Sequence, residues 1–206
     1  MSVAGYPTVI KLGGTTTAMT DQATTNTSGN IWQITDATRR VLDRDVLPTF
    51  EDAAVPISAA DILSIDYLFG IVEFTAAKTG PITFATGSFI PVTGIAGANA
   101  FTLNQSAGML DDTEFAGDGS RSKVYGLRDV ALSITRILAV EAVFFAAINN
   151  RTALFIEVQP GGSGDIAKGW YVTESEVGSG DIEGLENTEL SFQLDGDPEA
   201  VFGWGT

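Results

Sequence analysis

The chain has 206 residues, 44% of them hydrophobic, and a formal net charge of −15 from 26 acidic and 11 basic residues. This length and apolar content suffice for one packed globular unit. The negative charge opposes nonspecific binding to nucleic acid or anionic membranes. Cysteine and histidine are absent, which removes disulfides, thiolate metal sites and the usual general base. Composition therefore argues against hydrolytic or metal-dependent chemistry, and we predict neither an enzyme nor a cofactor.

Targeting and membrane signals do not stand out. No basic segment followed by an apolar run opens the chain, so we expect no secretory signal and a mature chain that starts near Met1. The longest apolar segment, Ile137 to Ile148, is interrupted by Glu141 and is shorter than the roughly 20 residues that cross a bilayer. We expect a soluble protein without membrane insertion.

The first distinctive segment, at about 12–30, is dominated by Thr, Gly, Ala and Asn and lacks apolar periodicity. This composition predicts a polar extended N-terminal arm or mobile loop. A helix is then expected from Asp36 to Leu47, with Asp36 as its cap and Pro48 enforcing its end. Within it, the mixed-sign cluster from Arg39 to Asp45 fits either a solvated face or a subunit contact.

Short β-type segments separated by Gly, Pro, Asn and Asp fill most of the remaining chain, as in an antiparallel sandwich or barrel. Apolar and polar residues alternate strictly in Arg128 to Arg136 and again in Glu186 to Asp195, so each strand has one buried face. The predicted inner-face residues are Val130, Leu132, Ile134, Leu190, Phe192 and Leu194. Weaker strand candidates are 30–35, 63–75, 82–84, 101–104, 153–159 and 168–177. The predicted class is mainly β.

One segment has helical spacing. Between about 138 and 149, apolar residues recur three and four positions apart, and Asn149-Asn150 offers a stop. We predict one α-helix here, packed on a sheet, with Phe144 and Phe145 in the core. No period of 20 to 50 residues repeats, so the sequence predicts a single domain spanning 1–206 and not a solenoid.

Glycine-rich and acidic motifs were weighed as binding sites. Gly161 to Asp165 is similar to one calcium-binding nonapeptide, but such cages need tandem copies, so we predict a hairpin loop. A tight turn explains Asp195 to Pro198 without an ion. The three Trp residues suit either a sugar-stacking platform or core and interface anchors. Nothing singles out a carboxylate pair for glycoside hydrolysis.

Two long connections, 86–97 and 111–125, stand between the predicted strands. Loops of this length in a compact domain are usually functional or become ordered by a partner. The second loop is rich in charged residues. Its candidate contact residues are Asp111, Asp112, Glu114, Arg121 and Lys123.

Several segments, in order along most of the chain, carry a family resemblance: Ile31–Asp36, Arg40–Asp43, Ile65–Phe74, Phe101–Leu103, Met109–Phe115, Gly126–Ser133, Lys168–Ser175 and Leu190–Gly196. In these segments the chain resembles the major tail proteins, or tail tube proteins, of siphophages. The resemblance implies a β-sandwich-like subunit with one packed helix. Six such subunits form a ring whose inner strands close into a continuous β-barrel, and the rings stack into a tube.

The resemblance also implies partners and a location. The chain would assemble with itself, contact the tape measure, tail terminator and distal tail proteins, and reside in the virion after synthesis in the host cytoplasm. Genomic DNA would pass through the lumen without sticking. From strand parity and local charge, the candidate lumen-lining acids are Glu157, Glu174, Glu176 and Glu189. The charged loop at 111–125 would make ring-to-ring contacts.

Three alternatives remain open from the sequence. An inner-tube ring protein of a secretion system is similar in architecture to the phage tube. A monomeric carbohydrate-binding β-sandwich is compatible with the tryptophans, and a carboxylate-pair glycosidase with the many acids. The self-assembling tube predicts very large particles, which a monomeric sugar binder does not form.

Overall fold

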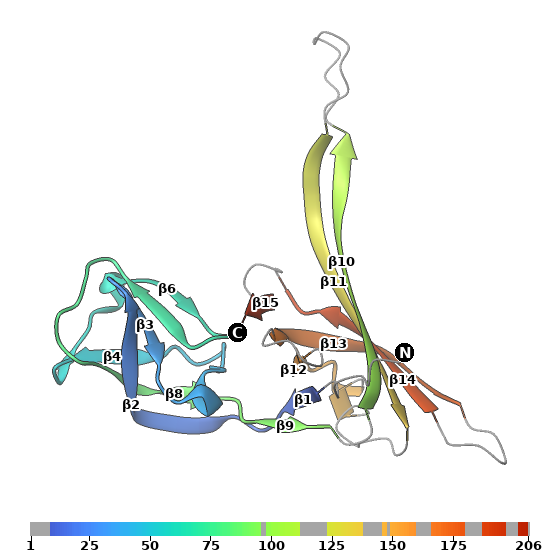
Figure 1. Cartoon of the computed structure of the whole chain (residues 1–206), viewed down its shortest axis with the longest axis horizontal. Helices are drawn as coiled ribbons and strands as arrows, with labels where there is room; N and C mark the ends of the chain where they lie inside the picture. Colours follow the sequence, from blue (N-terminus) through green and yellow to red (C-terminus); the bar gives the residue numbers. More distant parts are fainter. Residues whose placement is uncertain are drawn as a thin grey trace, which may run out of the picture.

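Antiparallel strands make up most of the regular structure. The computed structural model describes residues 9–95, 98–111, 123–137, 146–147, 149–159, 166–179, 187–196 and 202–205. These residues form two antiparallel sheets, of eight and seven strands (Figure 1). The predicted mainly β, antiparallel class is therefore confirmed.

The eight-stranded sheet has the strand order β10-β11-β14-β13-β12-β1-β9, with β15 also pairing β13. β1 comes from the start of the chain, and the other seven strands come from the stretch between Val92 and Gly205. Their bounds are β1 (Val9–Gly13), β9 (Val92–Gly94), β10 (Ala98–Asp111), β11 (Lys123–Ile137), β12 (Leu154–Gln159), β13 (Ile166–Ser179), β14 (Asn187–Leu194) and β15 (Phe202–Gly205).

The seven-stranded sheet has the order β5-β4-β8-β2-β3-β7-β6 and is built from one continuous stretch of chain. That stretch lies between β1 and β9, which pair with each other, so the whole sheet is an insertion between two neighbouring strands. Its strands are β2 (Thr17–Ser28), β3 (Ile31–Ile34), β4 (Thr49–Asp52), β5 (Val55–Pro56), β6 (Ile62–Asp66), β7 (Ile71–Phe74) and β8 (Ile82–Phe89). Two 3-10 helices join them: η1 (Ala37–Arg39) and η2 (Ala59–Asp61).

The prediction of an arm or loop at about 12–30 is wrong. Thr17–Ser28 forms the 12-residue strand β2, which pairs with β8 on one side and with β3 on the other. Met19 is the only fully buried side chain of this strand. The segment therefore lacks the alternation of apolar and polar residues that would have predicted a strand. The threonines favour extended backbone, and the ladders to both neighbours hold it in the sheet.

The helix expected over 36–47 is also wrong beyond its first turn. Asp36 does cap a helix, because its Oδ1 accepts a hydrogen bond from the Thr38 N–H at 3.0 Å, but η1 ends at Arg39. The next residues turn away to bond with the sheet. Leu42 donates its N–H to the Tyr67 carbonyl at 2.8 Å and is buried, so tertiary packing overrides the local helical signal.

The predicted helix at about 138–149 falls mostly outside the described residues. Residues 138–145 and 148, including Phe144 and Phe145, are not among them. Ala146, Ala147 and Asn149 are helical, and Ala147 is buried. The extent of the helix and the core position of the two phenylalanines stay predictions.

Each sheet has its own core. In the eight-stranded sheet, Val130, Leu132, Ile134, Leu190 and Phe192 are buried together, which confirms the face predicted from their alternation. The partly buried Leu194 packs against them.

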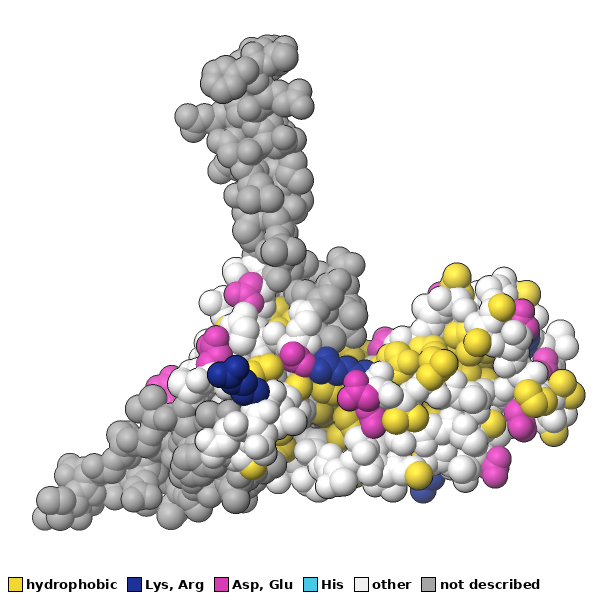
Figure 2. Space-filling view, turned by 180° about the vertical axis from the view of Figure 1, so that it is seen from behind, with side chains coloured by type: hydrophobic (Ala, Val, Ile, Leu, Met, Phe, Trp, Pro, Cys, Tyr) yellow, Lys and Arg dark blue, Asp and Glu magenta, His cyan; other side chains and the backbone are white. Residues whose placement is uncertain are grey.

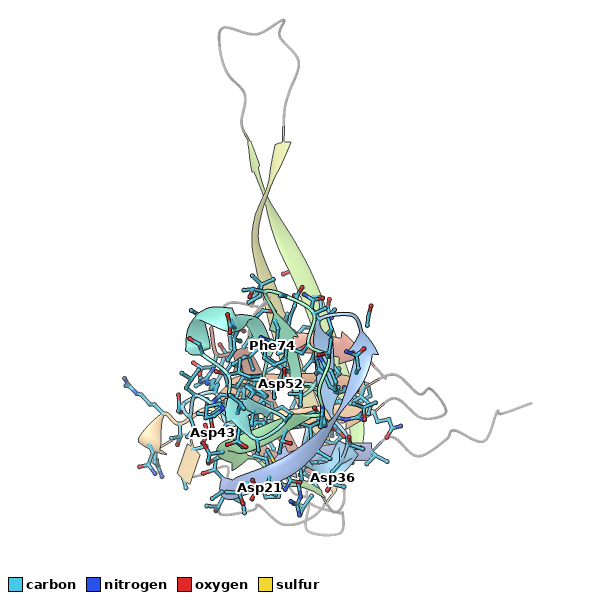
Figure 3. All side chains as sticks on the ribbon, turned by 90° about the vertical axis from the view of Figure 1, so that its left-hand side faces the viewer. Asp21, Asp36, Asp43, Asp52 and Phe74 are labelled. Carbon is cyan, nitrogen blue, oxygen red and sulfur yellow. The ribbon has the colours of Figure 1, made fainter. Side chains whose placement is uncertain are left out.

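The core of the seven-stranded sheet is rich in aromatic rings. Phe50 meets Phe74 and Phe84 edge to face, with ring centroids 5.9 and 5.4 Å away. Phe74 lies in the middle of this unit, while Asp21, Asp36 and Asp43 lie at its rim (Figure 3). This sheet therefore closes a hydrophobic core from one continuous stretch of chain.

A third, smaller core lies between the two sheets. Val41, Leu68 and Ile90 from the inserted segment pack against Phe155 of β12 and Trp170 of β13. The two rings meet at 5.4 Å with an interplanar angle of 70°. This junction joins the sheets by burial of apolar surface.

The last strand reinforces the junction. β15 lies between the bulk of the two sheets in Figure 1. A Cβ added at Gly203 would come within 2.5 Å of the Phe69 ring, and one at Gly205 within 2.8 Å. These glycines let the strand backbone approach the β6–β7 turn closely, which a larger residue would prevent.

Candidate functional site

Among the described residues, two long strands of the eight-stranded sheet have an open edge. β10 pairs with β11 along its length, and its other edge has no strand partner among the described residues. β12 covers only Ala167–Tyr171 of β13, so residues 172–179 have no described partner on that side. Both edges belong to the same four strands, β10-β11-β14-β13. An open edge with free N–H and C=O groups is a template for another strand.

The β10–β11 hairpin extends well past the rest of its sheet (Figure 1). β14 pairs with β11 only from Ala131 to Ile137, whereas β10 continues along β11 to Lys123. At the far end of the described ladder, Asp111 is the partner of Lys123. The hairpin therefore projects beyond the rest of the fold (Figure 1).

One face of β10, β11 and β14 is mainly polar. The register places Thr102 of β10 opposite Ser133 of β11, which in turn is opposite Ser191 of β14. Ser133 donates a hydrogen bond to Glu189 Oε1 at 3.2 Å, and the Gln193 amide donates to Asp129. The buried residues Leu132 and Phe192 occupy alternate positions, on the other face.

Among the described side chains of β10, β11 and β14, the exposed acids of this face have no basic counterpart. The face carries short polar groups and carboxylates, among them Asp129 and Glu189. No Lys or Arg is among the described side chains of β10, β11 and β14. The result is a hydrated surface of negative sign.

Three of the four predicted lumen-lining acids lie on the neighbouring strands β13 and β14, and Glu157 lies on β12. Glu174 and Glu189 are exposed. Glu174 sits at the register shift between Thr173 and Ser175. Glu176 pairs with Leu190, and its side chain lies outside the described residues. The lumen roles of these three remain predictions.

Glu157 is a correction. Glu157 is only 3% exposed, whereas a residue that faces an open lumen would be exposed to solvent. Its Oε1 is 2.6 Å from Lys11 Nζ and its Oε2 is 3.7 Å from Lys168 Nζ. Both lysines are its cross-strand partners, Lys11 on β1 and Lys168 on β13. Strand parity alone could not reveal these partners, because they depend on the register of three strands.

The predicted inter-ring residues are only partly described. Asp111 and Lys123 are cross-strand partners. Asp112, Glu114 and Arg121 lie outside the described residues. The contact role of all five stays a prediction.

Sequence reasoning missed a polar link between the sheets. Arg44 donates a hydrogen bond to the Asp195 carbonyl at 3.1 Å and forms an ion pair with the Asp195 carboxylate. Its guanidinium lies 5.4 Å from the centre of the Trp170 ring, in the range of a cation–π contact. Part of the Arg39–Asp45 cluster thus makes contacts within the chain, a use that neither sequence interpretation included.

Alternative chemistries find little support in the described part of the chain. There, no three carboxylates gather as a metal site would need. Trp32 and Trp170 are buried at 8% and 4% exposure, so these two rings cannot form a sugar-stacking surface. None of the described helices is long and apolar enough to span a membrane.

Comparisons with known proteins found similarity only at the level of structure. No family model and no curated protein matches the chain. A chain from the virion of a native gene transfer agent particle has 18% identity and a TM-score of 0.47, over 56% of this chain and 89% of that one. A chain from the tail of an empty gene transfer agent particle, refined with C6 symmetry, has 18% identity and a TM-score of 0.48, over 56% and 87%.

Proposed function

We propose that this chain is a structural, non-enzymatic subunit of a phage-like tail tube, in which hexameric rings stack around a passage for DNA. One observation carries the proposal. The four strands β10-β11-β14-β13 form a sheet with an open edge on each side among the described residues. A head-to-tail contact that joins the β10 edge of one copy to the β13 edge of the next repeats until a ring closes.

The polar face suits the inner wall of such a ring. Its described side chains are short polar groups with the carboxylates of Asp129 and Glu189. Phosphates of a passing duplex would meet negative charge there and no Lys or Arg among the described side chains of β11 and β14. Proteins bind DNA mainly when Lys and Arg neutralise its phosphates and release the counterions condensed on it. A wall without such residues would therefore let DNA slide past. The exposed Glu174 on β13 would add to this wall, whereas the register pairs Glu176 with Leu190 of the opposite face.

The projecting hairpin suits contacts between rings. It extends past its own sheet (Figure 1), and in this proposal its far end, with Asp111 and Lys123, would contact a neighbouring ring. Asp112, Glu114 and Arg121 would join it there. The tape measure, tail terminator and distal tail proteins would meet the ends and the lumen of the same tube. In this proposal the two sheets, joined through Phe155 and Trp170, behave as one domain.

The decisive experiment blocks the open edge of β10. In an antiparallel pair, N–H groups of neighbouring residues point alternately toward the partner and away from it. Asn104→Pro and Gln105→Pro are both made. One of them removes a hydrogen bond from β10 to β11, and the other removes only an N–H group on the free edge of β10. We expect the free-edge variant to keep the wild-type fold by circular dichroism and to lose assembly entirely.

Negative-stain microscopy and sedimentation of the purified chain, at increasing concentration, provide the readout. Leu63→Pro is the matched control, because Leu63 is an exposed residue at a register shift on β6, the outer strand of the seven-stranded sheet. Rings or tubes from this control and none from the free-edge variant support the proposal. A wild-type chain that stays monomeric at every concentration would falsify it.

A further inference from the structure

A pocket of about 490 Å³ lies at the junction of the two sheets. Its walls come from β1, η1, β9, β12 and β13 and from the turn after β6. Three of the chain's 11 basic residues, Lys11, Arg40 and Lys168, line it, together with a single carboxylate, Glu157. In a chain with a net charge of −15, this is a local reversal of sign.

The single carboxylate is shared between two ammonium groups. Glu157 lies 2.6 Å from Lys11 and 3.7 Å from Lys168, and the side chains of Glu157 and Lys168 are only 4% and 10% exposed. Desolvation by burial lowers the pKa of Lys168, Glu157 opposes this, and the charges of Lys11 and Arg40 lower the pKa further. The one carboxylate therefore does not neutralise both ammonium groups.

Arg40 adds a third cation. Its Nε donates to the Ile34 carbonyl at 2.9 Å and a terminal N–H to the Thr35 carbonyl at 3.5 Å. No carboxylate of the described residues lies within ion-pair distance of it. Asp66, the other acid that acts on Lys168, already accepts the N–H groups of Leu68 and Phe69. Positive charge left in a half-buried pocket is costly until an anion joins it.

Apart from Thr38, the rest of the lining is apolar. Phe69, Phe89 and Pro91 contribute to the walls, and the Lys168 ammonium lies 4.8 Å from the centre of the Phe69 ring. A carboxylate on a short aliphatic stem matches this combination: the stem packs on the rings and the charged end meets the cations. The side chain of Glu or Asp has this chemistry.

We propose that this pocket binds a carboxylate side chain presented by a second copy of this chain. The inference rests on the proposed self-assembly and names one of its contacts. Copies that each carry −15 repel one another, so close association needs local charge complementarity. The chain has 26 acids to offer and few basic residues to receive them. A DNA phosphate is disfavoured, because the same net charge repels a polyanion.

The first test measures binding to the unassembled full-length chain. Glutarate, a dicarboxylate with an aliphatic stem, is titrated against lysine-labelled protein, with sodium chloride at equal ionic strength as the reference. We expect the NMR signals of Lys11 and Lys168 to shift and that of Lys78, on the seven-stranded sheet, to stay. Arg40→Gln should weaken glutarate binding at least about tenfold. If inorganic phosphate shifts these signals and glutarate does not, or if neither does, the proposal is overturned.

The second test measures assembly. Arg40→Gln should raise the concentration at which assembly begins at least about tenfold. Lys78→Gln, the matched control, removes a positive charge at a side chain that pairs with Asp61 beside the seven-stranded sheet and does not line the pocket, and should leave the onset unchanged. Should Arg40→Gln lower the melting temperature, Lys168→Gln replaces it, since Lys11 still neutralises Glu157 there.

The outcomes separate the two proposals. If the wild type assembles and Arg40→Gln assembles at the same concentration, the pocket proposal is overturned and the tube function stands. A wild type that never assembles overturns the function and with it the second copy as occupant. The glutarate titration then decides whether the pocket binds carboxylates at all.

Discussion

The two sheets share antiparallel pairing but differ in which parts of the chain form them and in how their edges are paired. The seven-stranded sheet comes from one continuous stretch of chain and closes a core of Phe50, Phe74 and Phe84. The eight-stranded sheet combines β1 with strands from a later stretch of chain and, among the described residues, leaves open edges on two long strands. Figure 2 shows hydrophobic side chains at the surface over the seven-stranded sheet, with Lys and Arg in small groups next to acids near the junction. The seven-stranded sheet is thus an inserted unit, and the eight-stranded sheet that carries it has open edges among the described residues.

The largest expected effect tests whether the inserted sheet is a separate unit. Phe74 is fully buried and touches Phe50, so Phe74→Ala should cost about 3–5 kcal/mol of unfolding free energy. Because the junction core couples the sheets, we expect one cooperative transition at a lower denaturant concentration. Hydrogen exchange read separately for β7 and β14 checks this. Loss of protection in β7 alone would show two independently unfolding units.

A smaller effect is expected from tightening the junction. A Cβ at Gly203 would lie 2.5 Å from the Phe69 ring and 3.0 Å from Leu68, so Gly203→Ala should cost about 1–3 kcal/mol through overpacking. Gly94→Ala is the matched control, because nothing lies within 4 Å of its added Cβ. Thermal unfolding of the two variants compares them directly. Equal melting temperatures would contradict the close approach of β15 to the β6–β7 turn.

The smallest effect concerns pH and the core of the eight-stranded sheet. Burial raises the pKa of Tyr171 above its ordinary value of 10.0. The folded state therefore holds this proton where the unfolded chain releases it, so stability is lost as pH rises above about 10. One pH unit above that value the loss is about 1.4 kcal/mol, and Tyr171→Phe should abolish it. Denaturant unfolding at pH 9 to 11 measures the slope of both proteins, and parallel slopes would refute this assignment.

Lys168 acts in the opposite direction. Its pKa is lowered by burial, so its folded form gives up the proton more readily than the unfolded chain does. Its contribution to stability therefore rises with pH up to its ordinary value of 10.5. The Tyr171→Phe comparison isolates the tyrosine, because Lys168 is present in both proteins.

Predictability from sequence followed the range of the interactions. The strands around Leu132 and Phe192 were predictable, since alternation is written into neighbouring residues. β2 was not, because only Met19 of its side chains is fully buried and its partner β8 lies far along the chain. The prediction of a helix after Asp36 was wrong for a related reason, because Leu42 donates its N–H to Tyr67, in the turn between β6 and β7.

By itself, the sequence determined the composition and the local patterns of this protein: the missing cysteine and histidine, the excess of acids and the two clearly alternating strands. The tertiary structure alone decided which strand edges stay open, and that Lys11, Glu157 and Lys168 meet across three strands at a pocket completed by Arg40. The physical reason is that periodicity is a property of neighbouring residues. Register and charge pairing between distant strands are fixed only when the sheets pack.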